Sequence, residues 1–154
     1  MLREAIAERL KGAMKARDAG TVSAVRLILA SLKEHDVARR GEGGSKALSD
    51  PEILRMLQGM IKQRREAIGL FEKGGREDLA AKERQEIVVI ESFLPRQLGP
   101  EETEERAKAA IAELGAMGVK DMGRVMAFLK ERHAGAIDLA EASAILRRLL
   151  GSGG

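Results

Sequence analysis

The sequence predicts an all-α fold, with a helical N-terminal domain of about four helices and a small three-helix C-terminal tail domain. Apolar residues recur at the helical period through almost every segment of the chain. No segment shows the sustained alternation of apolar and polar residues, flanked by hairpin turns, that is typical of strands. Two prolines and a glycine within residues 95–100 mark the best internal boundary. We therefore expect one domain over residues 1–96 and a tail domain over residues 97–150.

Two helices are predicted before residue 40. The first predicted helix stops near residues 18–20. It carries apolar residues spaced four apart, which are Leu2, Ile6, Leu10 and Met14. Thr21 is the expected N-cap of the second helix. The apolar face of that helix combines Val25, Ile28, Leu29 and Leu32. Residues 40–45, with the sequence RGEGGS, then predict a flexible connection.

Two longer helices complete the predicted N-terminal domain. Ser49 followed by Glu52 has the spacing of a capping box, and Pro51 suits the first turn of the helix that follows. This third helix should end at the glycine pair of residues 74–75. Its apolar positions are Ile53, Leu57, Met60, Ile61, Ile68 and Phe71. A fourth helix is expected over residues 76–94, because Pro95 cannot continue it.

Three shorter helices are predicted for the tail domain. The first covers about residues 101–114 and is broken by Gly115. The second covers about residues 120–134, with an apolar stripe that we expect in the core: Met122, Val125 and Met126. The third begins at Asp138, with Glu141 three positions later as in another capping box.

Composition excludes several classes of protein. The chain has 154 residues, of which 44% are hydrophobic, so it has enough apolar material for a core and does not resemble a disordered protein. It has no cysteine, which excludes a disulfide scaffold, a cysteine-ligated metal and a cysteine nucleophile. No apolar run approaches the roughly 20 residues that a membrane span needs. We expect a cytoplasmic protein without a membrane partner.

No catalytic, metal or cofactor site is predicted. Neither a dinucleotide-binding glycine motif nor a P-loop is present. His35 and His133 do not have the spacing of metal ligands, and both are expected near helix C-termini. The carboxylates of Glu83 and Glu86 alternate with Lys82 and other cations, which is typical of a mixed helix surface.

The strongest local feature is a basic cluster in the third predicted helix. The segment KQRR, residues 62–65, follows Arg55, and Arg76 with Arg84 extends the basic surface from the next helix. Such cations can contact phosphates, but composition alone favours a solvated face with local ion pairs. Aromatic residues make up only 2% of the chain. Any RNA contact would therefore be to the backbone, because base-stacking modules need aromatic side chains.

The order and spacing of five segments resemble the GatB/YqeY family over nearly the whole chain. These segments are 62–68 (KQRREAI), 71–80 (FEKGGREDLA), 82–83 (KE), 90–98 (IESFLPRQL) and 120–126 (KDMGRVM). The resemblance implies a helical domain and a three-helix tail similar to the end of the B subunit of the glutamine-dependent tRNA amidotransferase. In that enzyme these parts help to hold tRNA, and the kinase and glutaminase chemistry lies elsewhere. The family label is carbon–nitrogen ligase with glutamine as amido-N donor.

We therefore expect a tRNA-associated module that is non-catalytic alone. Two alternatives remain. The chain could take part in the amidation reaction, or it could be a protein–protein adaptor for an amidotransferase or an aminoacyl-tRNA synthetase. No cofactor is implied. The candidate tRNA contacts are Lys62, Arg64, Arg65, Arg76, Lys120, Arg124 and Lys130.

Overall fold

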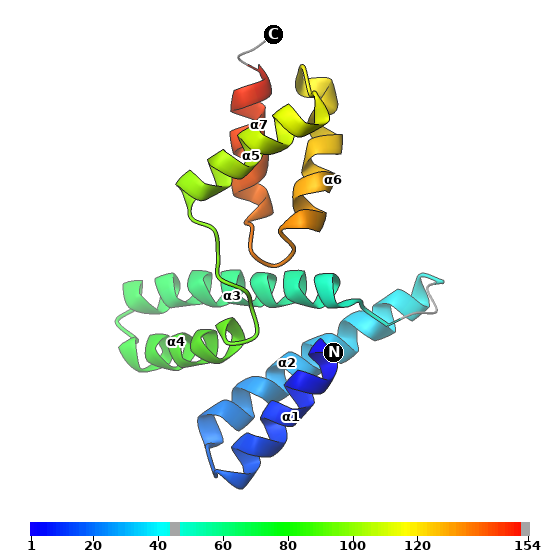
Figure 1. Cartoon of the computed structure of the whole chain (residues 1–154). Coiled ribbons are helices and arrows are strands. Elements are labelled where there is room, and N and C mark those ends of the chain that lie inside the picture. Colours follow the sequence, from blue (N-terminus) through cyan, green and yellow to red (C-terminus); the bar gives the residue numbers. More distant parts are fainter. Residues whose placement is uncertain (44–46, 152–154) are drawn as a thin grey trace. The chain divides into compact units, whose positions relative to one another are not determined.

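The computed structural model describes residues 1–43 and 47–151 (Figure 1). Within them the chain forms seven α-helices and one short 3-10 helix, with no strand. The all-α prediction is confirmed. The chain divides into two compact units, Met1–Leu94 and Pro95–Gly154, and each is described by itself below.

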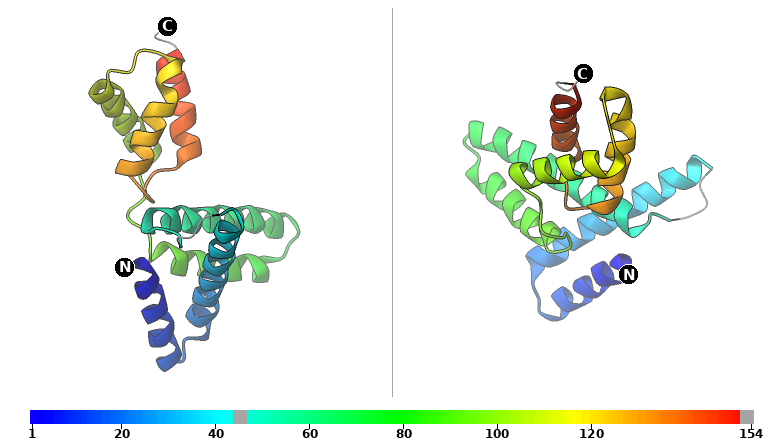
Figure 2. Two further views of the ribbon diagram at one scale, coloured as in Figure 1. Left: turned by 90° about the vertical axis from the view of Figure 1, so that its right-hand side faces the viewer. Right: turned by 45° about the horizontal axis from the view of Figure 1, so that its top comes forward.

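The first unit begins with an antiparallel helix pair, α1 (Leu2–Lys15) and α2 (Ala19–Gly41), which lie side by side in both views of Figure 2. The prediction for Met14 is wrong, because its side chain is 52% exposed and Ala13 is buried in its place. A spacing of four residues advances by about 40° beyond a full helical turn. By the fourth member, the stripe has rotated away from the face that is centred on the fully buried Ile6.

The N-cap of α2 is Asp18, not Thr21 as predicted. The Asp18 carboxylate accepts the backbone N–H of Thr21 at 3.1 Å and its hydroxyl at 2.7 Å. An aspartate three positions before the N3 residue satisfies a free N–H of the first turn, so α2 begins earlier than expected. The helix also ends later, because it continues through Arg40 and Gly41, which were predicted to be flexible. Residues 44–45 of the predicted connection lie outside the described residues.

Helix α3 (Asp50–Lys73) begins with the predicted capping box. The hydroxyl of Ser49 accepts the Glu52 N–H at 3.4 Å, and the Glu52 carboxylate accepts the Ser49 N–H at 3.2 Å. The helix ends at Gly74, as predicted. Helix α4 (Glu77–Glu91) lies along α3 (Figure 1) and is shorter than predicted, because residues 92–94 form a turn before Pro95.

The core of the first unit is aliphatic. Side chains from all four helices meet in it, and the largest fully buried ones are Ile6, Val25, Ile28, Ile53, Leu57 and Ile90. The faces of α2 and α3 that enter this core therefore determine which of their cations face solvent.

The second unit contains α5 (Pro100–Leu114), the 3-10 helix η1 (Val119–Asp121), α6 (Met122–Arg132) and α7 (Leu139–Gly151). Gly115 ends α5 in the left-handed conformation, with φ of +65°. Asp138 accepts the Glu141 N–H at 3.1 Å at the start of α7. Val125 is fully buried and Met122 and Met126 pack against the same core, as predicted.

Candidate nucleic-acid interface

Arg64 is engaged inside the first unit. Its side chain is only 14% exposed, and its Nε donates to a Glu86 carboxylate oxygen at 2.9 Å. One of its terminal nitrogens also donates to the carbonyl of Met60 at 3.2 Å, and Glu83 lies 3.9 Å away. Burial raises the pKa of Glu83, and the nearby Glu86 carboxylate raises it further. The charge of Arg64 therefore joins α3 to α4.

Arg65, Arg76 and Arg84 of the predicted cluster also have carboxylate partners, whereas Arg55 makes no salt bridge within the described residues. Arg65 lies 3.3 Å from Glu91. Arg76 donates two hydrogen bonds to Asp78, at 3.1 and 3.2 Å, and these bonds lower the pKa of that carboxyl. Arg84 contacts two acidic residues in the same way, Glu72 and Glu77. At these three arginines, the structure agrees with the alternative interpretation of a solvated face with local ion pairs.

In the second unit, Arg124 donates to the carbonyl of Leu114 at 3.0 Å and lies 3.4 Å from Asp121. The exposed Lys120 and Lys130 make no salt bridge within the described residues, and the same holds for Lys62 in the first unit. Of the seven predicted contacts, the structure thus leaves three lysines unpaired and engages four arginines with groups of the protein itself.

The outer face of α2 carries cations that the sequence reasoning missed. Arg26, Lys33 and Arg40 are seven residues apart and exposed. None of them makes a salt bridge within the described part of the chain. The spacing of seven was the available signal, because residues separated by about two turns share a helix face. It was obscured by the denser run at residues 62–65.

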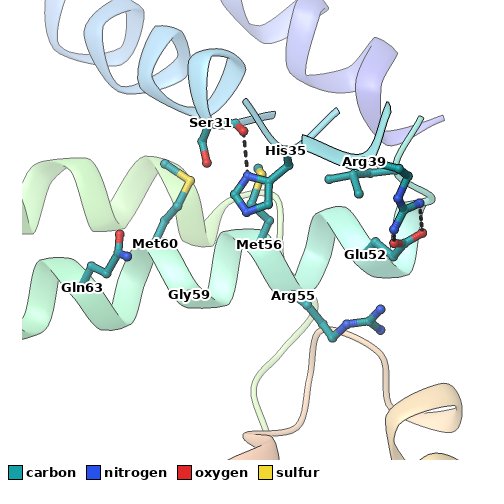
Figure 3. A pocket seen from close by; sticks show the side chains of 10 residues that line it. Ser31, His35, Arg39, Glu52, Arg55, Met56, Gly59, Met60 and Gln63 are labelled. Carbon is teal, nitrogen blue, oxygen red and sulfur yellow. Dashed lines mark hydrogen bonds and ion pairs between the residues drawn. The ribbon is translucent and has the colours of Figure 1, made fainter. Parts of the chain in front are cut away.

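A pocket of about 440 Å³ lies between α2 and α3, and Figure 3 shows the residues that line it. The Nδ1–H of His35 donates to the backbone carbonyl of Ser31 at 2.8 Å, so in the neutral ring Nε2 is the acceptor. This bond goes to the carbonyl and not to the hydroxyl of Ser31, so the two residues do not form a nucleophile–base pair. Met56 and Met60 lie close to the His35 ring.

The charged groups that line this pocket do not point toward His35. Arg39 donates to Glu52 at 2.9 Å, and Glu52 also takes part in the Ser49 cap. Arg55 points away from His35 in Figure 3. His133, in the second unit, is the C-cap of α6. Burial lowers the pKa of His133, and the nearby charges of Arg106 and Arg132 lower it further. Within residues 1–43 and 47–151, no group of three or more acidic or histidine side chains could hold a metal ion.

None of the described helices is long and apolar enough to cross a membrane. A family model described as "Yqey-like protein" matches residues 3–150. An uncharacterized protein of Schizosaccharomyces pombe is 31% identical over 94 residues, which are 61% of this chain and 72% of that protein. Proteins named altered inheritance of mitochondria protein 41, mitochondrial, are similar in Eremothecium gossypii (33% identical, 68% of this chain, 56% of that protein) and Saccharomyces cerevisiae (32% identical, 55% and 44%). The similarity to these last two thus covers about half of their length.

Proposed function

The chain belongs to the YqeY-like family, and from this premise we propose that it is a tRNA-associated helical module that is non-catalytic alone. In this proposal, exposed cations on its helices dock on the phosphate backbone of tRNA. With 2% aromatic residues, the chain has few side chains on which bases could stack. The contact is therefore to phosphate and shape.

The observation that carries the proposal is a set of exposed cations without a salt bridge in the described residues. The set includes Arg26, Lys33 and Arg40 on α2, Lys62 on α3, and Lys120 and Lys130 in the second unit. Such cations are free to displace the counterions of a nucleic acid, which is the main source of its non-specific affinity for proteins. Arg64, Arg65, Arg76 and Arg124 act in this proposal as structural ion pairs and not as contacts, because their charges are already engaged.

The absence of a catalytic arrangement around His35 supports the non-catalytic part of the proposal. The family label of carbon–nitrogen ligase, with glutamine as amido-N donor, requires a nucleophile and a phosphate-activating site. The pocket between α2 and α3 offers a histidine bound to a backbone carbonyl and an arginine paired with Glu52. We propose that the chain alone neither hydrolyses glutamine nor turns over ATP.

A second candidate function is favoured by one surface feature of the tail unit. Met117 and Val119 are 83% and 53% exposed and lie two positions apart in the α5–α6 connection. Exposed apolar side chains of this kind suit contact with another protein. They support the adaptor hypothesis, in which the partner is an amidotransferase or an aminoacyl-tRNA synthetase.

The proposed location is the cytoplasm. The absence of cysteine is compatible with this reducing compartment, in which disulfides are rare. Two of the relatives carry the word mitochondrial in their names. Because tRNA is present in both compartments, the proposed activity is the same in either.

Titration of fluorescently labelled tRNA with the full chain, followed by anisotropy, tests the proposal. We expect saturable binding with a Kd on the order of 10⁻⁶ M or weaker at physiological salt, in the range of non-specific complexes. The affinity is limited because the net charge is only +3. No binding up to about 10⁻⁴ M protein at low salt would refute tRNA association. Ammonia release from glutamine by the chain alone would refute its non-catalytic character.

A further inference from the structure

We infer that the outer face of α2, together with the turn before it, is the surface that meets the RNA phosphate backbone. The inference rests on the proposed function and deepens it by assigning the contact. We call this surface the α2 track, and it consists of Arg17, Arg26, Lys33 and Arg40.

The helix geometry aligns three members of the track. Seven residues advance by about 700°, so Arg26, Lys33 and Arg40 lie within roughly 40° of one line along α2. Each follows the previous one by about 10 Å, and the three together span about 21 Å. The opposite face is anchored in the core by Ala24 and the fully buried Ile28. The core therefore fixes the track toward solvent.

The carboxylates of α2 form no salt bridge with this line within the described residues, and only the charge of Arg40 acts on one of them, where it contributes after Arg3 to the lowered pKa of Asp36. Asp36 accepts two hydrogen bonds from Arg3, at 2.8 and 2.9 Å, and one from the Leu48 N–H at 3.1 Å. Asp18 is bound to Thr21. Glu34 is exposed, but it lies about 100° around the helix from its neighbour Lys33. This arrangement contrasts with the α3–α4 surface, where carboxylate partners engage four arginines: Arg64, Arg65, Arg76 and Arg84.

The N-terminal end of the track forms a hollow of about 530 Å³. Arg17, Ser23 and Arg26 line it together with three apolar residues, and no carboxylate is among its lining residues. A guanidinium group can only donate hydrogen bonds, and a serine hydroxyl can donate one to an oxyanion. Arginine can also bind phosphate through two parallel hydrogen bonds. A phosphate group is therefore the ligand chemistry that this hollow fits.

The backbone of Arg17 adds an independent observation. Its φ is +57°, and it is the residue after the C-cap of α1, where the Asp18 N–H bonds back to the carbonyl of Ala13 at 3.0 Å. Glycine is the usual residue at this left-handed position, because a side chain is strained there. Folding thus gives no reason for a long side chain at position 17. Its exposed charge beside Arg26 gives a functional reason.

A nucleic acid fits this surface better than an anionic membrane does. An interfacial helix inserts a continuous apolar face into the bilayer surface. The apolar face of α2 is already buried in the core of the first unit, and Leu27 and Val37 are isolated exposed side chains. A regular line of cations instead matches the regular charges of a polyphosphate backbone.

The test compares two triple variants of the full chain that each remove three cations from the first unit. Arg26→Gln, Lys33→Gln and Arg40→Gln neutralise the track. Arg65→Gln, Arg76→Gln and Arg84→Gln neutralise three exposed arginines that have carboxylate partners. Anisotropy with labelled tRNA at about 0.1 M salt should show at least about tenfold weaker binding for the track variant and less than about threefold for the control. Circular dichroism checks that both stay helical.

A third variant, Arg17→Gly, removes the charge and relieves the left-handed strain at the same time. Its affinity for tRNA should fall severalfold while its melting temperature stays the same or rises. A merely structural role of Arg17 would not separate these two readouts. Wild-type affinity in this variant would overturn the assignment of the hollow.

The remaining outcomes are distinct. Equal losses in the two triple variants, or wild-type binding by the track variant, would overturn the track while leaving tRNA association intact. Failure of the wild-type chain to bind tRNA would overturn the proposed function and the track together. Vesicles containing anionic lipid, or an acidic protein, that bind the chain and compete equally with tRNA for the track would also contradict the assignment to RNA.

Discussion

The Nε of Arg64, on α3, lies 2.9 Å from a carboxylate oxygen of Glu86, on α4, and the two side chains are 14% and 12% exposed. Glu83 lies on the same side of α4 at 3.9 Å from that nitrogen. One guanidinium group thus compensates two partly buried carboxylates. This arrangement makes Arg64 important for stability.

Replacement of Arg64 by alanine should lower the free energy of unfolding by about 2–3 kcal/mol at neutral pH, because Glu83 and Glu86 are left close together without a cation. Urea unfolding followed by circular dichroism measures this change. The exposed Lys62, two positions earlier, offers the matched control, and Lys62→Ala should change stability by less than about 0.5 kcal/mol. Equal effects of the two substitutions would refute the structural role of Arg64.

The effect of Arg64→Ala should depend on pH. Burial already raises the pKa of Glu83, and loss of the cation raises it further. In the variant, the folded state therefore binds protons at a higher pH than the unfolded chain does. Its stability relative to wild type should rise as the pH falls from 7 toward about 4.5. A deficit that is constant over this range would contradict the prediction.

The pair between Arg3 and Asp36 predicts a pH dependence that arises from a lowered pKa in the wild-type chain. Hydrogen bonds from Arg3 lower the pKa of Asp36, so the folded state binds the proton less readily than the unfolded chain. The stabilisation is present above the ordinary pKa of aspartate and is lost as the pH falls through the lower pKa of the folded state. Asp36→Asn should therefore destabilise the first unit by about 1–2 kcal/mol at pH 7. The difference from wild type should shrink below about pH 4 in acid titrations.

The capping box of α3 should contribute about 1 kcal/mol to the free energy of unfolding. Ser49→Ala removes the acceptor for the Glu52 N–H and should lower stability by this amount in urea unfolding. Ser49→Asp keeps an acceptor at the same place and should restore most of the loss. An alanine variant as stable as wild type would show that the cap is not needed.

Two glycines of the tail unit should respond with opposite signs. Gly115 has φ of +65°, so Gly115→Ala should destabilise the tail unit by about 1 kcal/mol. Gly123 lies in α6, and an added Cβ meets no atom within 4 Å. Gly123→Ala should therefore be neutral or stabilising by up to about 1 kcal/mol. Thermal unfolding of both variants checks the contrast.

Most of the fold could be predicted because its signals are local. The capping box at Ser49 and the left-handed glycine after α5 each act within a few residues. Errors arose where two local signals compete, as at Asp18 and Thr21, or where a regular spacing differs from the helical period, as at Met14. At Asp18 the hydrogen bonds of its carboxylate to Thr21 decide the outcome, and at Met14 the face of α1 centred on Ile6 does.

The candidate site was less predictable, because it depends on pairing between helices. The run at residues 62–65 is the densest in positive charge, but the carboxylates that neutralise its arginines lie on α4, more than 20 positions away. The α2 track is sparse in the sequence and becomes a surface only when Ala24 and Ile28 are buried on the opposite face. The proposed interface therefore rests on charge that remains unpaired after folding, and not on charge density along the chain.

The salt dependence of tRNA binding by the full chain tests the central claim most directly. If the four cations of the α2 track each neutralise one phosphate, the logarithm of the association constant should fall linearly with the logarithm of the salt concentration, with a slope of roughly −3 to −4. An affinity that does not change between about 0.05 and 0.2 M salt would contradict phosphate docking and would favour an apolar protein–protein contact instead.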